Sequence, residues 1–199
     1  EFQIFGKGSK NAADQVWVAR YDGPGNDYDA VASIAVDIAG NSYVTGSSYN
    51  INFDADITTI KYDTFGHPDW TNRYNSPEES DEIASALVID AARNVYVTGN
   101  SYAFGTGEDY LTIKYSTNGG IRWIARYNGT GNAYDAAASL AVDAGGNVYV
   151  TGVSSGLGTI EDMVTVKYTS LGAQLWAQRY VGPVNDYDAG AAIALDASG

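Results

Sequence analysis

The sequence predicts an all-β protein in which four-stranded antiparallel units follow one another in tandem. A W-x-x-R-Y pattern opens at Trp17 and recurs three more times at steps of 53 residues. A fixed period of this kind is typical of repeat architectures. Between its copies, short apolar or alternating runs are separated by turns that contain Gly or Asn. The 23 glycines and 16 tyrosines also favour short strands and tight turns over helices.

The strands are clearest in the unit that runs from residue 29 to residue 74. Its first segment, DAVASIAVD, is apolar on both alternating faces, which is typical of a strand covered on both sides. NSYVTG and DITTIKYD follow, rich in the Val, Ile, Tyr and Thr that favour strands. The four predicted strands cover residues 29–37, 41–46, 56–63 and 70–74.

The same unit divides the chain. Residues 1–14 match it poorly, so we expect either a degenerate end strand or a disordered lead-in there. The repeats occupy residues 15–199, with a fourth strand at 15–22, full units at 29–74, 82–127 and 135–180, and the first strand of a further unit at 188–199.

A unit of four antiparallel strands that needs neighbours to cover its faces describes a blade of a β-propeller. The small residues of the first strand fit the crowded axis, and the bulky aromatic residues of the later strands fit the wider periphery. We expect the repeated aromatic and basic residues to join blades, by stacking or by pairing with acids. These residues are Trp17, Trp70, Trp123, Trp176, Arg20, Arg73, Arg126, Arg179, Lys61, Lys114 and Lys167.

The repeated motifs D-x-A-x-x-[IL]-[AV]-[VIL]-D-x-x-x-N-x-Y-V-T-G, D-x-x-T-[IV]-K-Y and G-x-x-x-W resemble the bacterial β-propeller repeat of large secreted or surface proteins. The resemblance covers about residues 15–199. It implies a propeller, often seven-bladed, that is not an enzyme and lies outside the cell or at its surface. It also implies that the loop into strand one and the loop between strands two and three share one face.

Composition narrows the range of partners. The formal charge of −13, from 24 acidic and 11 basic residues, repels nucleic acids and anionic membranes. No apolar run approaches the roughly 18 residues of a membrane span. The absence of cysteine excludes disulfides and thiolate metal sites. His67 is the only histidine, which excludes a multi-histidine metal site and, on the predicted loop face, a histidine-based triad.

The candidate ligand residues are acids near the start of each first strand. Asp29, Glu82, Asp135 and Asp188 could form a ring that binds Ca²⁺ or a cationic ligand, because hard cations take clusters of oxygen ligands. Alternatively, each acid accepts hydrogen bonds from nearby backbone N–H groups and shapes its loop. Apart from this possible Ca²⁺, no cofactor is expected.

One loop departs from the repeat and is a further candidate. Glu78, Glu79 and Asp81, together with Glu82, replace the Gly-rich sequence of the other loops. This loop is a candidate for contact with a partner or a cation, with a solvated loop as the alternative.

Other repeated residues leave a similar choice. Tyr28, Tyr134 and Tyr187 either face a ligand such as a sugar or fill the base of a loop. Asp37, Asp90, Asp143 and Asp196 each lie beside a tight turn, where Asp and Asn normally bond the turn backbone.

The predicted function is a non-catalytic module for binding or assembly, because a catalytic site needs different groups whereas repeats supply copies. Open apolar strand edges favour self-association or further blades of a longer parent protein, and the loops could bind a carbohydrate or protein ligand. Two alternatives remain open. One is a propeller-type glycoside hydrolase or lyase with paired carboxylates on the loop face. The other is a structural building block of a filament or surface layer.

Overall fold

The computed structural model describes residues 2–7 and 15–196, and every element in them is a β-strand. A two-stranded sheet is followed by three four-stranded sheets, named blades 1 to 3. The two-stranded sheet contains β1 (Phe2–Lys7) and β2 (Gln15–Tyr21). Blade 1 contains β3 (Asp29–Val36), β4 (Ser42–Tyr49), β5 (Ala55–Tyr62) and β6 (Pro68–Tyr74). Blade 2 contains β7 (Glu82–Ile89), β8 (Val95–Ala103), β9 (Gly107–Tyr115) and β10 (Ile121–Tyr127). Blade 3 contains β11 (Asp135–Val142), β12 (Val148–Ser155), β13 (Glu161–Tyr168) and β14 (Gln174–Tyr180).

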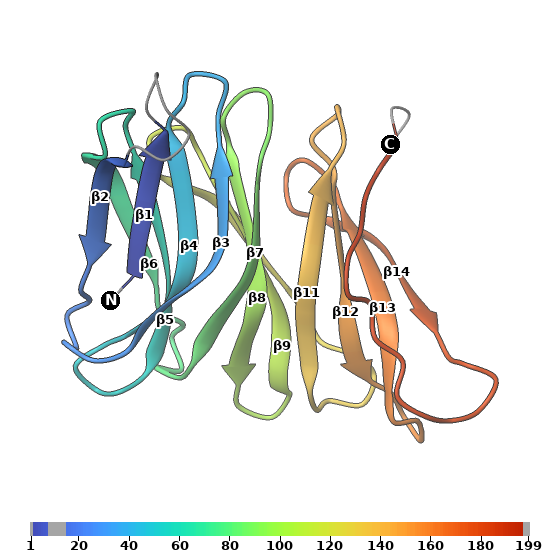
Figure 1. Ribbon diagram of the computed structural model, residues 1–199. Helices are drawn as coiled ribbons and strands as arrows, with labels where there is room; N and C mark the ends of the chain where they lie inside the picture. The colour runs from blue at the N-terminus through green and yellow to red at the C-terminus, as the bar shows by residue number, and fades with distance from the viewer. Residues whose placement is uncertain (1, 8–14, 197–199) are drawn as a thin grey trace.

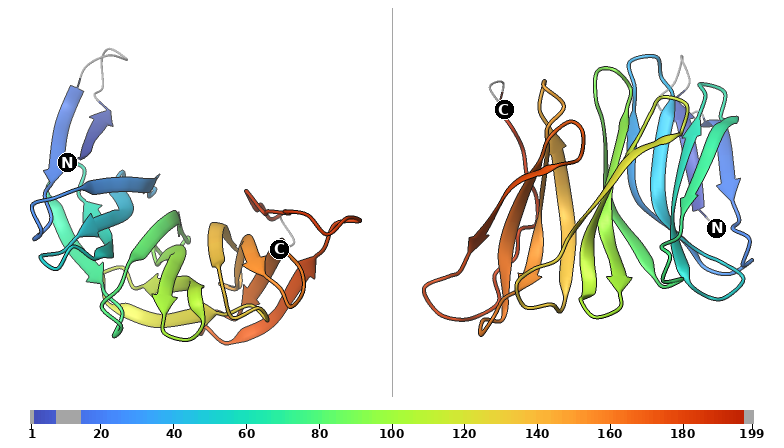
Figure 2. Two further views of the ribbon diagram at one scale, coloured as in Figure 1. Left: turned by 90° about the horizontal axis from the view of Figure 1, so that it is seen from below. Right: turned by 180° about the vertical axis from the view of Figure 1, so that it is seen from behind.

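Each blade is a simple antiparallel meander, because its strands pair in the order of the sequence. The blades stand side by side in an arc (Figure 1), with β3, β7 and β11 on its concave side and β6, β10 and β14 on its convex side (Figure 2). The predicted all-β fold of four-stranded antiparallel sheets is confirmed. Nowhere in the described part of the chain is there a helix long and apolar enough to cross a membrane.

The two ends of the repeat region differ from the central blades. Residues 2–7 form β1, which pairs antiparallel with β2 as a third strand pairs with a fourth. The rest of the predicted lead-in, residues 1 and 8–14, lies outside the described residues. Residues 188–196 were expected to form a first strand, but no strand is assigned there. The reason is that a first strand bonds only to the second strand of its own blade, and no such partner follows among the described residues.

A bulge in each first strand requires glycine in the neighbouring second strand. In blade 2 the register shifts between Ala84 and Ala86, opposite Gly99. A Cβ on Gly99 would lie 1.9 Å from the carbonyl oxygen of Ile83, a backbone atom that no rotamer change can move. The same contact occurs at Gly46 and, at 2.1 Å, at Gly152. The repeated V-T-G sequence therefore follows from close approach of two backbones.

The hydrophobic core lies between sheets and not within them. Tyr43 and Ile57 of blade 1 share one cluster with Leu111 and Tyr115 of blade 2. A second cluster joins blades 2 and 3, and a third joins β2 to blade 1. Each sheet therefore keeps its apolar faces out of water only through its neighbours.

The repeated tryptophans join consecutive sheets on the convex side of the arc. Trp70 of blade 1 packs against Tyr115 of blade 2 with ring centroids 6.1 Å apart, and its Nε1 donates to the carbonyl of Thr117 at 3.2 Å. Its ring occupies the space beside Gly119, whose φ is +82° and where a Cβ would lie 2.7 Å from the indole. Trp17 and Trp123 make the same ring contact with the next sheet. The prediction that these tryptophans join blades is confirmed for all three.

Blade 3 has one uncovered side. In blade 2, five consecutive residues of β9 are buried, whereas the buried residues of β13 alternate with partly exposed ones. Trp176 occupies the place of Trp123, but its ring contact is an edge-to-face one with Tyr149 of its own sheet, and it is 42% exposed. The side of blade 3 that faces away from blade 2 is therefore an apolar surface that no blade covers among the described residues.

The close backbone approach at the bulge predicts that a single added methyl group at Gly99 lowers stability markedly. Gly99→Ala should lower the free energy of unfolding by at least about 2 kcal/mol, because two backbones must separate to admit the new Cβ. Urea denaturation would measure the change. Gly120→Ala is the matched control, because Gly120 is exposed and its nearest neighbour is the Ser116 hydroxyl at 3.3 Å. Equal effects of the two substitutions would contradict this account of the bulge.

Candidate functional site

Two sets of loops emerge together at one end of the blades, the lower end in Figure 1. The inter-blade loops (residues 22–28, 75–81, 128–134 and 181–187) lead into the first strands, and the intra-blade loops (50–54, 104–106 and 156–160) join second to third strands. Hydrogen bonds tie the inter-blade loops to the ends of the second strands: Gly25 N–H donates to the Tyr49 carbonyl at 3.2 Å and Ser155 N–H to the Tyr134 carbonyl at 2.9 Å. Between the two sets of loops, Ile160 N–H donates to Asn185 Oδ1 at 3.4 Å. We call this end the loop face.

Most acidic side chains of the chain belong to the loop face, whereas the opposite end carries few. The loop-face acids are Asp22, Asp27, Asp29, Asp54, Asp56, Glu78, Glu79, Asp81, Glu82, Glu108, Asp109, Asp135, Glu161, Asp162, Asp186 and Asp188.

The acids that open the first strands shape the inter-blade loops. Each accepts a hydrogen bond from the backbone N–H six residues earlier, and the donor–acceptor distances lie between 2.6 and 3.1 Å. Asp29, Glu82 and Asp135 are buried. The structure therefore favours the hydrogen-bonding alternative over a solvent-facing ring of ligands. The four donor–acceptor pairs are Gly23–Asp29, Ser76–Glu82, Gly129–Asp135 and Gly182–Asp188.

The arginine of each fourth strand binds an aspartate at the start of the third strand of the same blade. Arg73 Nη2 lies 2.6 Å from Asp56 Oδ2, and the corresponding distance between Arg179 Nη1 and Asp162 Oδ2 is 3.0 Å. Arg126 Nη2 is 3.4 Å from Asp109. These ion pairs thus lie within blades, because the third and fourth strands are hydrogen-bonded neighbours. The predicted inter-blade contact is seen at Arg73, whose Nη1 also donates to the Tyr21 hydroxyl of the preceding sheet at 2.9 Å.

A serine at the end of each second strand completes this polar network. Arg73 Nη1 donates to Ser48 Oγ at 2.7 Å, and Arg179 Nη1 donates to the Ser154 carbonyl at 2.6 Å. Ser101 Oγ donates to Glu82 Oε1 at 2.9 Å, which links the second strand of blade 2 to the first. These serines were not predicted as part of a site, although their spacing of 53 residues follows that of the tryptophans.

Burial raises the pKa of three loop-face carboxyls. Burial raises the pKa of Glu82, against hydrogen bonds from Ser76 and Ser101 that lower it, and the nearby Asp56 carboxylate also raises it. Burial likewise raises the pKa of Asp109 and of Asp135. The nearby Asp135 carboxylate also raises the pKa of Asp109. Against the effect of burial, the Arg179 guanidinium lowers the pKa of Asp135.

The unusual acidic loop of blade 2 is partly structural. Glu78, Glu79 and Asp81 are exposed. Asp81 Oδ1 accepts a hydrogen bond from Ala55 N–H of blade 1 at 2.8 Å. Glu79 adopts φ +49°, the left-handed conformation that Asn26 and Asn132 adopt in the neighbouring loops. In residues 2–7 and 15–196, no group of three or more Asp, Glu or His side chains could hold a metal ion.

At the opposite end, the repeated aspartates bind their own turns, as predicted. Asp37 accepts hydrogen bonds from Asn41 N–H at 3.0 Å, from Asn41 Nδ2 at 2.9 Å and from the Tyr43 hydroxyl at 3.1 Å. Asp90 and Asp143 make the corresponding bonds. Although burial acts in the other direction, hydrogen bonds from Asn41 lower the pKa of Asp37.

The repeated lysines lie over tyrosine rings of the same blade. Lys167 Nζ is 4.6 Å from the ring centroid of Tyr149, and Lys114 Nζ is 4.9 Å from that of Tyr96. The prediction that the lysines join blades is therefore wrong for these ring contacts, because the tyrosines belong to the neighbouring second strand. Lys114 also donates to the Ser170 carbonyl of blade 3 at 3.3 Å, which is an inter-blade contact.

A hollow of about 220 Å³ lies at the loop-face end of the junction between blades 1 and 2. Tyr28 and Tyr49 meet there edge to face, with ring centroids 6.5 Å apart, and Ile83 and Val31 contribute partly exposed apolar surface. Tyr28 is 66% exposed, so it faces solvent and does not fill the base of its loop. Aromatic side chains around a shallow hollow suit apolar or sugar ligands.

Tandem four-stranded meanders, inner first strands and cores shared between sheets define a β-propeller module. Residues 16–54 match the family model described as "Beta-propeller repeat" (SBBP), and this match covers β2, β3 and β4. The chain thus contains a repeat of that family.

Solved structures that resemble the chain include the following two. The first is described as "Crystal structure of the eukaryotic initiation factor", and its protein is 9% identical in sequence to this chain. The two structures superpose with a TM-score of 0.50, over 81% of this chain and 34% of the other. This chain thus spans about a third of that protein, and the likeness concerns the fold alone. A protein of unknown function from Bacteroides caccae is 12% identical with a TM-score of 0.42, over 83% of this chain and 71% of the other.

The raised pKa of Glu82 predicts a specific pH dependence. As pH rises above the ordinary value of 4.5, the unfolded chain loses the Glu82 proton before the folded chain does. The contribution of this carboxyl to the free energy of unfolding should therefore fall with rising pH and level off above the raised pKa. Glu82→Gln removes the titration, so the difference between wild type and variant isolates it. Urea denaturation between pH 4 and pH 8 would measure the free energy of unfolding of the wild type minus that of the variant. This difference should fall as pH rises, and a difference that increases with pH would contradict the burial argument.

Proposed function

We propose that the chain is a β-propeller segment built from 53-residue blades and that it acts as a non-catalytic module for binding or assembly outside the cytoplasm. In this proposal the three blades are part of a ring that further blades complete. The extracytoplasmic location is supported by the resemblance to repeats of secreted and surface proteins.

The uncovered side of blade 3 is the observation that carries the proposal. Trp123 packs on Tyr168 of the next blade with centroids 6.3 Å apart, and its Nε1 donates to the Ser170 carbonyl at 3.0 Å. Trp176 holds the same position in blade 3 with neither partner. Tyr180 is 52% exposed, whereas its counterpart Tyr127 packs against the core between blades 2 and 3. These side chains suit the face of one more blade.

The missing blade could come from a longer parent chain or from a second copy of this one. A further blade of the repeat would present a tyrosine at the end of its third strand and a glycine in the following turn, as Tyr168 and Gly172 do in blade 3. A second copy would instead present the sheet of β1 and β2, because its own third-strand tyrosines already pack on the tryptophans of the preceding sheets. Exposed apolar side chains on the uncovered side favour association in either case. A structural building block of a filament or surface layer would use the same surface repeatedly.

Ligand binding is a second candidate function, supported by the hollow beside Tyr28 and Tyr49. Its aromatic lining suits a carbohydrate or an apolar side chain of a protein ligand. The alternative of a glycoside hydrolase or lyase would need free carboxylates facing a cleft. Instead, Asp29, Glu82 and Asp135 are buried and bonded to backbone N–H groups, which supports a non-catalytic role.

Two tryptophan substitutions test the assembly proposal. Trp123→Ala should lower the free energy of unfolding by about 3 kcal/mol, because it opens a junction inside the arc. Trp176→Ala should change it by less than about 1 kcal/mol, because the indole has no partner blade. Urea denaturation would measure both.

The same variants distinguish folding from association. Sedimentation velocity should show that wild type associates as its concentration rises and that Trp176→Ala weakens this association at least tenfold. A wild-type protein that stays monomeric at every concentration would count against assembly through a second copy.

A further inference from the structure

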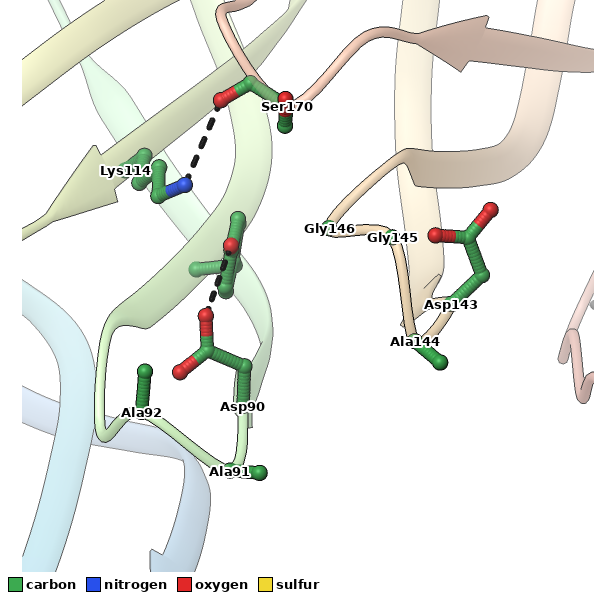
Figure 3. A pocket seen from close by; sticks show the side chains of 10 residues that line it. Asp90, Ala91, Ala92, Lys114, Asp143, Ala144, Gly145, Gly146 and Ser170 are labelled. Carbon is green, nitrogen blue, oxygen red and sulfur yellow. Dashed lines mark hydrogen bonds between the residues drawn. The ribbon is translucent and has the colours of Figure 1, made fainter.

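A second hollow lies at the end of the blades opposite the loop face, between blades 2 and 3. It has a volume of about 300 Å³, and the turns after β7 and β11 form two of its walls (Figure 3). Asp90 and Lys114 of blade 2 lie on one side, and Gly145 and Gly146 of blade 3 face them from the other. None of these residues belongs to the loop face.

The corresponding gap between blades 1 and 2 contains an arginine. Arg93, in the turn after β7, has its Nε 4.0 Å from Asp37 Oδ2 of blade 1. Its φ is +63°, a conformation in which the same turn of blade 1 has Gly40 and that of blade 3 has Gly146. A guanidinium from one turn thus lies against the turn carboxylate of the preceding blade.

Gly146 leaves the second gap without that arginine. A Cβ on Gly146 would lie 3.8 Å from the Tyr96 hydroxyl, which itself donates to Asp90 Oδ2 at 3.0 Å. A side chain at this position would therefore point toward Asp90, as Arg93 points toward Asp37. The second gap has the carboxylate and the phenol of the first gap, but it lacks the guanidinium.

The other charged groups of the hollow leave room for a cation at Asp90. Lys114 Nζ donates to the Ser170 carbonyl and lies over the Tyr96 ring. Lys61 holds the same position in the first gap, where it pairs with Asp69 at 2.8 Å and coexists with Arg93. Asp143 also lines the hollow, with Oδ2 accepting from Asn147 Nδ2 of its own turn at 2.7 Å.

We propose that this hollow binds a guanidinium group, presented as the arginine side chain of a peptide or protein partner. Asp90 supplies the carboxylate that accepts its N–H donors, and the Gly145–Gly146 turn leaves the space that a planar group needs. Arginine fits better than lysine because its fork of donors matches a carboxylate and its plane stacks on neighbouring groups. The site does not depend on how the ring is completed.

The test is a titration of ¹⁵N-labelled protein with N-acetyl-L-arginine amide, followed by NMR. The proposal predicts saturable shifts of the Ala91, Ala92, Gly145 and Gly146 amide signals. The matched probe N-acetyl-L-citrulline amide has nearly the same shape without the charge, and it should bind about tenfold more weakly, since a charge-assisted hydrogen bond is lost. Equal binding of the two probes, or shifts with acetate in place of the arginine probe, would overturn the proposal.

Two variants make the test reciprocal. Gly146→Arg should abolish the shifts, because its own guanidinium occupies the hollow as Arg93 does in the first gap. Arg93→Gly should add a second site, with new shifts at Ala39 and Asn41 beside Asp37, and it should fold because glycine suits a φ of +63°. Retained binding in Gly146→Arg, or no second site in a folded Arg93→Gly protein, would overturn the assignment.

Discussion

The structure depends on the burial of sheet faces against neighbouring sheets. A strand such as β9, buried along most of its length, cannot be stable in a lone sheet, because both of its faces would meet water. At each junction β2, β6 or β10 places a tryptophan across to the next sheet, where it packs on a tyrosine and occupies the space above a turn glycine. Aromatic pairs of this kind contribute about 0.5–1.5 kcal/mol beyond the area that they bury. Since the contact recurs at every junction, stability increases with each blade that is added.

The repeat allowed the fold to be predicted, because the residues that form the strands, the turns and the contacts between sheets all recur once per period. The four strands of each blade, the turn glycines and the role of Trp70 and Trp123 could be predicted from spacing and residue type alone. The lack of a strand at residues 188–196 could not be predicted in this way, because strand formation needs a partner as well as a suitable sequence. The polar network was only partly predictable: the sequence showed that Arg73 and Asp56 recur, but not that they meet within one blade.

The loop-face acids show how composition can mislead about function. A face with so many carboxylates suggests a cation site, yet the repeated acids are used internally, since Asp29, Glu82 and Asp135 hold the inter-blade loops through backbone N–H groups. Differences between copies are more informative than the copies themselves. The first gap contains Arg93, whereas the second gap has Gly146 at the same place in the turn and is hollow. Likewise, Trp123 packs on the next blade, whereas Trp176 has no such partner and is exposed.

Native-state hydrogen exchange tests the central claim most directly, because it reports the stability of each sheet separately. If neighbours on both sides stabilise a sheet, the amides of β8 and β9 in blade 2 should exchange most slowly, and those of β12 and β13 in blade 3 should exchange faster at the same pH and temperature. Equal protection of blades 2 and 3 would contradict the account, because it would mean that a sheet with one uncovered face is as stable as one covered on both sides.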